Sequence, residues 1–446
     1  MVKRTFIVLL FAFSFLLLTA CNIKTTTTTT NSKNTQTSST EKTVPISIPS
    51  YTFTYPVVYE KDVIYASPKE VENADGSIMK PYSLNNAINK MNAGETIFLF
   101  PGTYEIEGGL TLSKAGSETD RNRIIALPND IIFDFMKGDG LTITGSYWYI
   151  YNIKFINSSD TGCKVTGRNN IIEKCESYNN ERHGFSCGET SPNSSYNQFR
   201  NCVAKENYGK SSYGFHLFGE GLDNSLYNCI SYRNQQTGFY IYNKKRVLVT
   251  NCISISNGID INGDLTSSGI GFDFSDSDHI FENCTAFNNG SGFYVKRNGG
   301  KITFGNSSSI NNVVNYDSST DGSTNIKISN SLSYNTSGTP KKDIIIGEAT
   351  NCLFYVNNTY YYTGIFEKDI NTIEEQNLGT ELNSEEKEAY VIDIEFPIGF
   401  DPSNIITIDG FLFPKNFLDR NEEFQNMLFP EEKPITYFGS KYKTAE

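Results

Sequence analysis

The sequence predicts an all-β fold, a parallel β-helix in which short strands wind into coils that stack along one axis. A motif made of Asn-Cys or Lys-Cys, a following Asn and a Gly-Phe pair occurs five times between residues 174 and 293. Its period of roughly 20 to 35 residues is typical of a solenoid. The surrounding segments alternate β-branched or aromatic residues with polar ones, which indicates strands. The copies run from Lys174 to Phe185, Asn201 to Phe215, Asn228 to Phe239, Asn251 to Phe272 and Asn283 to Phe293.

The first 50 residues predict an export signal followed by a tether. Lys3 and Arg4 precede an apolar run that ends in Leu-Thr-Ala-Cys at Cys21, which predicts a secretory signal over residues 1–20. The tetrapeptide resembles the lipobox of bacterial lipoproteins. This implies that Cys21 is acylated and anchors the chain to a membrane of the bacterial cell envelope, outside the cytoplasm. An ordinary signal with a chance cysteine is the alternative. Residues 21–50, rich in Thr, Ser and Asn, predict a flexible tether.

The β-helix is expected over residues 51–365, and its first part contains a helix. After Ser83, a suitable N-cap, four apolar residues share the spacing of one helix face. They are Leu84, Ala87, Ile88 and Met91. A short amphipathic helix here would close the open end of the solenoid, which otherwise exposes strand edges. A strand is expected at Thr96–Phe100 and a turn at residues 101–103, and strand-and-turn units are expected to continue through Arg123–Leu127 and Leu141–Ile156.

Residue types that recur in successive coils predict vertical ladders. Stacked strands lie about 4.8 Å apart, so equivalent side chains meet. An Asn ladder would link side-chain amides and hold a bend that tolerates left-handed backbone geometry. Its members are Asn180, Asn207, Asn234, Asn257, Asn289, Asn312 and Asn357. Each Gly-Phe pair supplies another bend and an inward ring, and Gly140-Leu141 and Gly162-Cys163 extend this register.

A cysteine ladder lies five residues before the Asn ladder. It contains Cys175, Cys202, Cys229, Cys252, Cys284 and Cys352, with Ser307 and Ser331 in two coils. Metal ligation and disulfides are the alternatives, but no C-x-x-C cluster occurs and stacked Cβ atoms point the same way. We predict buried thiols that act as small apolar fillers.

The coils weaken after Lys301 and end near Tyr362, and residues 366–446 are predicted to form a mixed C-terminal cap. This part includes a charged, helix-compatible stretch from Glu374 to Ala389. The net charge of −12 argues against nucleic acid as a partner. We expect a monomer.

Two segments resemble a known family. Residues 65–104, beginning YASPKEVENADGS, and residues 140–167, GLTITGSYWYIYNIKFINSSDTGCKVTG, are joined by the Asn-Cys and Gly-Phe coils. They are similar to right-handed β-helix polysaccharide lyases, in particular family 9, the pectate and exopolygalacturonate lyases. The resemblance covers residues 64–296. It implies a right-handed β-helix acting on uronate-rich, pectate-type glycans by elimination.

The resemblance also implies a calcium site and a lysine base, which this sequence does not supply. The family's first calcium-binding Asp falls on Tyr213, and the next three fall on Gln236, Thr237 and Tyr240. The family's Lys falls on Asp273. Calcium prefers several carboxylate oxygens, which these residues do not offer. We therefore expect no metal and no other cofactor.

The residues that follow each Gly-Phe pair predict a candidate site on the outside of one sheet. Strand alternation turns the Phe inward. The residue directly after the Phe points outward, and so does the residue two positions beyond that one. The first outward column contains Ser186, His216, Tyr240, Asp273 and Tyr294, and the second contains Phe218, Tyr242, Ser275 and Lys296.

Three column members, His216, Tyr240 and Asp273, are the candidate catalytic residues. They stand on three successive coils, so the backbones of neighbouring members lie about 5 Å apart, and histidine is a base near neutral pH. Aromatic rings suit sugars and Lys suits carboxylates. This predicts substrate binding by Tyr213, Phe218, Tyr242, Tyr294 and Lys296.

Two classes of function remain open. The first is a lyase-like enzyme that acts on an acidic polysaccharide at the cell surface. The second is a degenerate lyase scaffold that binds glycan without cutting it, or an adhesin. The column residues could also be ordinary solvent-facing strand residues. A hydrolase needs two carboxylates across the scissile bond. The dense acidic group of this stretch consists of Asp273, Asp276 and Asp278. Two of these three residues lie in a predicted turn, where acidic residues usually only mark a polar bend, so the group does not favour a hydrolase.

Overall fold

The computed structural model describes most of the chain between residues 63 and 368. The described ranges are 63–126, 131–188, 194–209, 211–242, 245–258, 269–275, 278–296, 301–318, 325–329, 331–334, 347–356, 359–368, 380–381, 390–392 and 436–438. The chain divides into two compact units, residues 1–56 and 57–446, and the described residues all belong to the second. The predicted signal, Cys21 and the tether lie outside the described residues. Within the described part, no helix is long and apolar enough to cross a membrane.

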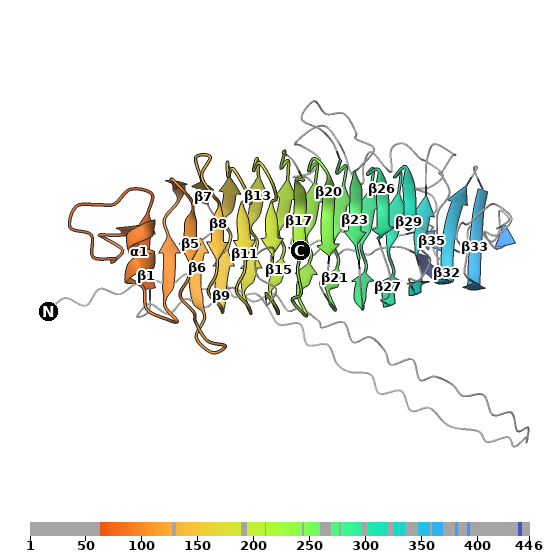
Figure 1. Cartoon of the computed structure of the whole chain (residues 1–446), viewed down its shortest axis with the longest axis horizontal. Helices are drawn as coiled ribbons and strands as arrows, with labels where there is room; N and C mark the ends of the chain where they lie inside the picture. The colour runs from red at the N-terminus through yellow and green to blue at the C-terminus, as the bar shows by residue number, and fades with distance from the viewer. Residues whose placement is uncertain are drawn as a thin grey trace, which may run out of the picture. The chain divides into compact units, whose positions relative to one another are not determined.

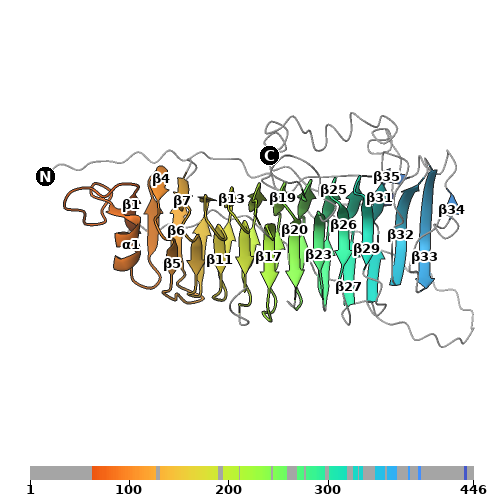
Figure 2. The ribbon, with the colours of Figure 1, turned by 45° about the horizontal axis from the view of Figure 1, so that its top comes forward.

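The second unit is a solenoid of parallel strands, as predicted (Figures 1 and 2). A complete coil contributes one strand to each of three faces, and equivalent strands of successive coils pair in parallel. The first face contains β1 (Val63–Ser67), β3 (Thr96–Leu99), β6 (Asn122–Ala126), β9 (Trp148–Tyr151), β12 (Ile171–Glu173), β15 (Gln198–Arg200), β18 (Ser225–Tyr227), β21 (Leu248–Thr250), β24 (His279–Glu282), β27 (Lys301–Gly305) and β30 (Asn325–Ser329).

The other two faces complete each coil. The second face contains β4 (Gly102–Glu105), β7 (Ile131–Asp134), β10 (Lys154–Ile156), β13 (Glu176–Tyr178), β16 (Val203–Lys205), β19 (Ile230–Tyr232), β22 (Ile253–Ile255), β25 (Thr285–Phe287), β28 (Ser308–Ile310) and β31 (Leu332–Tyr334). The third face contains β5 (Leu110–Leu112), β8 (Leu141–Ile143), β11 (Cys163–Val165), β14 (Phe185–Cys187), β17 (Tyr213–Phe218), β20 (Thr237–Tyr242), β23 (Ile270–Phe274), β26 (Ser291–Val295) and β29 (Val314–Ser318). The candidate site lies on this third face.

A short helix closes the N-terminal end, as the apolar spacing predicts. Helix α1 (Leu84–Lys90) lies beside β1 and β2 (Tyr82–Ser83) at the end of the stack (Figure 1). It buries Leu84, Ala87 and Ile88, and Met91 is buried behind it. Ser83 occupies the N-cap position, but its side chain makes no capping hydrogen bond. The turn predicted at residues 101–103 is wrong at Gly102 and Thr103, which are the first two residues of β4.

The C-terminal end differs from the prediction of a further parallel coil. Strand β32 (Gly347–Val356) pairs in parallel with β30 and β31, but β33 (Thr359–Lys368) turns back and pairs with β32 in antiparallel orientation. The segment TYYYT at residues 359–363 is rich in strand formers and lacks the Gly-Phe pair that occurs in β17, β20, β23 and β26.

Little of the predicted C-terminal cap lies within the described residues. Within the stretch predicted to be helix-compatible, β34 (Thr380–Glu381) is instead a short strand on β33. Strands β35 (Tyr390–Ile392) and β36 (Thr436–Phe438) pair with each other in parallel. The remainder of 366–446 beyond β33, β34, β35 and β36 lies outside the described residues.

The Gly-Phe register is confirmed in the core. Five rings stack along the inside of the third face, from Phe185 to Phe293. The centroid distances are 5.1 Å between Phe185 and Phe215, 4.9 Å between Phe215 and Phe239, 4.7 Å between Phe239 and Phe272, and 4.8 Å between Phe272 and Phe293. All five rings are buried. The stack fixes which residues of the same strands lie on the outside.

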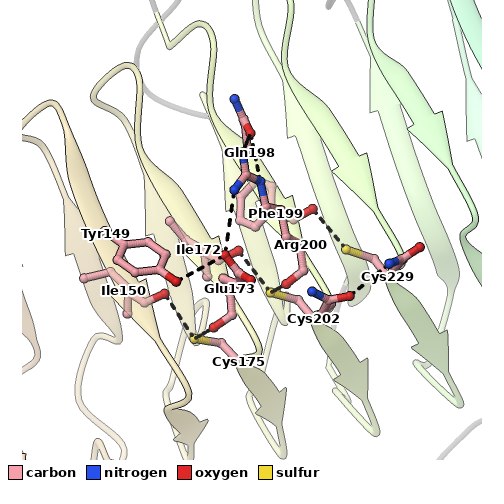
Figure 3. Close-up of polar contacts among 12 residues, drawn as sticks. Tyr149, Ile150, Ile172, Glu173, Cys175, Gln198, Phe199, Arg200, Cys202 and Cys229 are labelled. Carbon is pink, nitrogen blue, oxygen red and sulfur yellow. Dashed lines mark hydrogen bonds and ion pairs between the residues drawn. The ribbon is translucent and has the colours of Figure 1, made fainter. Parts of the chain in front are cut away.

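The cysteine ladder is confirmed as a row of buried, free thiols (Figure 3). The Cys202 thiol donates to the Ile172 carbonyl of the previous coil at 3.4 Å, and the Cys229 thiol donates to the Phe199 carbonyl at 3.3 Å. Ser307, in the same ladder, donates to the carbonyl two residues before it, as Cys202 also does. Burial raises the pKa of the Cys175 thiol to about 12, so this group stays neutral.

The Asn ladder is also confirmed, but the left-handed backbone lies one residue earlier than predicted. The Asn180 amide donates to Asn207 Oδ1 at 2.9 Å, and the Asn207 amide donates to Asn234 Oδ1 at 2.7 Å. The left-handed backbone falls on the residue before each ladder Asn, such as Asn179 (φ 56°), because the ladder amides are turned inward. Asn201, before Cys202, is also left-handed. Asn357 lies outside the described residues.

Candidate functional site

The first outward column is confirmed as a continuous row across the third face. Ser186 and His216 are Cα partners, and so are His216 and Tyr240, Tyr240 and Asp273, and Asp273 and Tyr294. Strands β17, β20, β23 and β26 lie side by side in Figure 2. The row extends further at both ends, to Lys164 and to Asp317. The Gly162-Cys163 pair is the signal that could have placed Lys164 in this row from the sequence.

The row is less exposed than strand alternation predicts. His216 is only 6% exposed and Asp273 only 4%. Four rings crowd around His216, with centroids at 4.3 Å for His183, 5.3 Å for Tyr213, 5.3 Å for Tyr240 and 5.6 Å for Phe218. The prediction of an exterior strip is therefore wrong at His216 and Asp273, and also at Ser186, which is fully buried. The four rings around His216 account for its burial.

The tyrosines of the site stack on each other. The Tyr213 and Tyr240 rings lie 4.6 Å apart at an angle of 6°, and Tyr240 and Tyr242 lie 5.4 Å apart at 8°. His183 continues the stack beyond Tyr213 at 5.0 Å. The Lys296 ammonium lies 5.9 Å from the centre of the Tyr242 ring. Because the ring faces are used within the stack, the site presents ring edges and hydroxyls to a ligand.

The other predicted binding residues flank this stack. Phe218 lies 6.2 Å from Tyr242, and both rings are partly buried. Tyr294 is partly exposed and is the Cα partner of Asp273 on the next strand. The structure therefore brings the five predicted binding residues and the three candidate catalytic residues to the outside of strands β17, β20, β23 and β26 or directly after them.

Burial gives the Asp273 carboxyl group an unusual proton affinity. Burial raises the pKa of Asp273 to about 7, and the nearby Lys296 charge opposes this only in part. Its Oδ1 atom has no hydrogen-bond partner among the described residues. At neutral pH this carboxyl group is therefore divided between its protonated and ionised forms. A group of this kind is suited to accept or donate a proton.

The phenols remain neutral near pH 7. Burial, and then the nearby Asp273 charge, raise the pKa of the Tyr240 hydroxyl well above its usual range. Burial likewise raises the pKa of Tyr213. Tyr240 is therefore a poor base at neutral pH but retains a proton that it could donate.

A cationic group lies at the start of the row. The Lys164 ammonium and the Arg182 guanidinium both bond to Asp160, at 2.5 Å and 3.3 Å. Burial favours the neutral form of Asp160, but the bonds from Lys164 and Arg182 outweigh this and lower its pKa. Arg182 also lines an open cavity of about 630 Å³, together with Lys137, Asn179 and Tyr208. Neither the cavity nor the Asp160 contacts follow from the repeat pattern.

Metal ligands are not gathered at this site. Across the described ranges, no group of three or more His, Cys, Asp or Glu residues is placed to hold a metal ion.

The fold and the register match one family of proteins. Residues 64–335 match the family described as "Pel9A-like, right handed beta helix region". The chain belongs to this family. The match covers the nine third-face strands and gives the coils their right-handed sense. It confirms the fold class and the family resemblance.

Proteins similar in sequence to this chain bear the names of pectate lyases. The chain is 30% identical over 325 residues to "Pectate lyase L" of Thermoclostridium stercorarium, which covers 66% of this chain and only 26% of that relative. It is 29% identical over 286 residues to "Pectate lyase L" of Dickeya chrysanthemi, which covers 57% of this chain and 67% of the relative.

Solved structures confirm the scaffold. The crystal structure of pectate lyase Pel9A has a TM-score of 0.54 and 25% identity, covering 62% of this chain and 76% of that one. A rhamnogalacturonan lyase has a TM-score of 0.56 at 20% identity, covering 65% of this chain and 87% of that one, and shows the fold alone. The scaffold is therefore polysaccharide lyase-like.

Proposed function

We propose that this Pel9A-like chain acts on uronate-rich, pectate-type glycans, with the Asp273 carboxyl group as the proton acceptor. The main observation in support is the position of Asp273, which lies in the row between Tyr240 and Tyr294. Its carboxyl group is buried, and burial raises its pKa to about 7. The names of the relatives supply the substrate class. Asp273 also stands where the family resemblance implies a base.

The reaction would be an elimination within the glycan. Ionised Asp273 takes the proton from the carbon next to the uronate carboxyl group. The released electron pair forms a carbon–carbon double bond, and the bond from the neighbouring carbon to the glycosidic oxygen breaks. The departing oxygen needs a proton, and Tyr240, the Cα partner of Asp273, retains one at neutral pH. His216, one strand further on, is the alternative donor.

The residues at the family's calcium positions do not fit a calcium ion. Tyr213 and Tyr240 are stacked neutral phenols 4.6 Å apart, and Gln236 and Thr237 also carry no charge. Calcium prefers several carboxylate oxygens. We therefore assign no step to calcium. We assign the contact with a uronate carboxylate to Lys296, and its position beside the Tyr242 ring supports this assignment.

The test is the absorbance of the unsaturated product. The full chain is incubated with polygalacturonate and other uronans, with added calcium or with a chelator. We expect absorbance to grow equally in both conditions and to stop in Asp273→Asn, which keeps the shape of the side chain but cannot accept the proton. Growth that requires calcium contradicts the metal-free site, and growth that persists in Asp273→Asn contradicts the role of Asp273.

A second function, glycan binding without cleavage, is favoured by the burial of His216 and Asp273. Buried side chains cannot touch a sugar unless the neighbouring rings move. A row of phenol edges could hold a glycan as a capture module or an adhesin. Binding of uronans without any absorbance growth distinguishes this function from a lyase.

We also propose that the chain works as a monomer anchored in the bacterial cell envelope through lipidated Cys21. The support is the lipobox-like segment Leu-Thr-Ala-Cys and the Thr-rich tether of residues 21–50. A tether of this composition would hold the solenoid away from the membrane, where it meets extracellular glycans.

A further inference from the structure

His183, which precedes the Gly-Phe pair of β14, carries a buried polar atom that the fold leaves unused. Its ring is fully buried between Tyr213 at 5.0 Å and His216 at 4.3 Å. The backbone N–H of Tyr213 donates to His183 Nδ1 at 3.3 Å. Nδ1 is therefore an acceptor, so the neutral ring holds its proton on Nε2. Burial, and then the nearby positive groups, lower the pKa of His183 and keep the ring neutral.

The Nε2–H group of His183 is thus a hydrogen-bond donor, and it has no partner among the described residues. Ser186, three residues later on β14, also has a buried hydroxyl with no partner in that part of the chain. Ser186 is the Cα partner of His216 and of Lys164. Burying such groups without a hydrogen bond costs free energy, so two of them within three residues of the same coil call for an explanation.

His279 shows that this fold can satisfy a buried histidine completely. Its Nδ1 accepts the backbone N–H of Val247 at 3.2 Å, as His183 Nδ1 accepts that of Tyr213. Its Nε2 lies 3.1 Å from the Ser275 carbonyl oxygen, an acceptor that His183 lacks. The open donor at His183 is therefore not a requirement of the coil geometry.

We propose that His183 and Ser186 form a hydrogen-bonding subsite for an oxygen of the glycan, one coil before His216. This inference rests on the proposed glycan function and extends its site. The Nε2–H donor requires an acceptor, which the carboxylate or a hydroxyl oxygen of a uronic acid supplies. The cations Lys164 and Arg182, held on Asp160 beside this coil, favour the carboxylate. Because His183 and Ser186 are fully buried, the proposal requires neighbouring side chains to move when the sugar binds.

Two serines of the same coil provide a matched test. The Ser186 hydroxyl has no partner, whereas the Ser177 hydroxyl donates to the Gly184 carbonyl at 2.7 Å. The full chain is titrated with an oligogalacturonate by calorimetry, and its Tm is measured. Ser186→Ala should weaken affinity about tenfold, the effect of one hydrogen bond, without lowering Tm. Ser177→Ala should lower Tm and leave affinity unchanged.

The histidines provide a second pair. His183→Phe keeps a ring in the stack but removes both Nε2–H and the Nδ1 acceptor of the Tyr213 N–H, so it should weaken affinity and also lower Tm. His279→Phe should lower Tm alone. The chain has three histidines, so the ¹⁵N signal of His183 can be assigned with this variant. Oligogalacturonate should shift the His183 Nε2 signal and leave that of His279 in place.

The outcomes separate the inference from the proposed function. Wild-type affinity in both Ser186→Ala and His183→Phe, with an unshifted His183 signal, overturns the subsite while the glycan function stands. A wild-type chain that binds no uronan overturns both.

Discussion

Asp273 connects the stability of the fold to pH at the scale of a single residue. Its pKa is about 7 in the folded chain and 3.8 when unperturbed, because burial disfavours the charged form. The folded state therefore binds the proton more tightly than the unfolded state does. This contribution to stability is fully present below about pH 4 and is lost as the pH rises towards 7.

Asp273→Asn removes this titration. We expect the wild type to lose up to about 1.4 kcal/mol per pH unit relative to the variant between about pH 4 and 7. Denaturant unfolding of both proteins at several pH values measures the difference. A difference in stability that stays constant with pH would contradict the raised pKa.

A buried carboxylate on the first face provides a second test at this scale. Glu173 is 1% exposed, accepts a hydrogen bond from the Tyr149 hydroxyl at 3.2 Å and lies 3.8 Å from the Arg200 guanidinium (Figure 3). Arg200→Ala removes the cation and leaves the carboxylate buried, so we expect a loss of about 1–3 kcal/mol in unfolding free energy. The control is Arg168→Ala at an exposed turn, expected to change stability by less than about 0.5 kcal/mol. Equal losses of unfolding free energy in the two variants would show that Arg200 does not stabilise the buried Glu173 carboxylate.

At the scale of the strand, the Phe stack stabilises the third face. Phe239 lies between Phe215 and Phe272, with both rings within 5 Å of its own. Phe239→Ala leaves a cavity in this stack, and we expect a loss of about 3–5 kcal/mol. Phe218→Ala on the outside of the adjacent strand β17, where the ring is partly exposed, should cost less. Chemical denaturation measures both, and similar losses would show that the stack has no special role.

The repeat in the sequence determines the register of these strands but not what covers them. The Gly-Phe spacing places Phe215 and Phe239 in the core and His216 and Tyr240 in one outside row, because each coil repeats the same geometry. The burial of His216 depends on the His183 ring, which comes from another coil. Contacts of this kind follow from side-chain size and direction, which a period does not specify.

At the scale of the whole molecule, the repeat pattern no longer predicts the fold correctly at the C-terminal end of the solenoid. Cys352 continues the cysteine ladder, which predicts another coil, but β32 is one long strand and β33 reverses direction. Where a Gly-Phe pair is expected, the chain has Gly364-Ile365, within β33. The antiparallel pair ends the parallel stack, because a further coil would need a parallel edge in the same register.

The predicted lipid anchor concerns the whole chain. Cys21→Ala removes the predicted acylation site, so we expect the protein to move from the membrane fraction to the soluble fraction of a bacterial host. Cell fractionation followed by blotting measures this. Cys352→Ala, which removes a buried ladder thiol, is the control and should leave the distribution unchanged. Membrane association that survives Cys21→Ala would rule out the lipid anchor.

The row of free thiols has a consequence for how the protein matures. Eight cysteines in the described part of the chain are buried and free, and none forms a cross-link there. Folding of the coils therefore needs neither an oxidant nor a disulfide isomerase, and the finished solenoid is indifferent to the redox state of its surroundings. Thermal melts with and without a strong reductant should coincide.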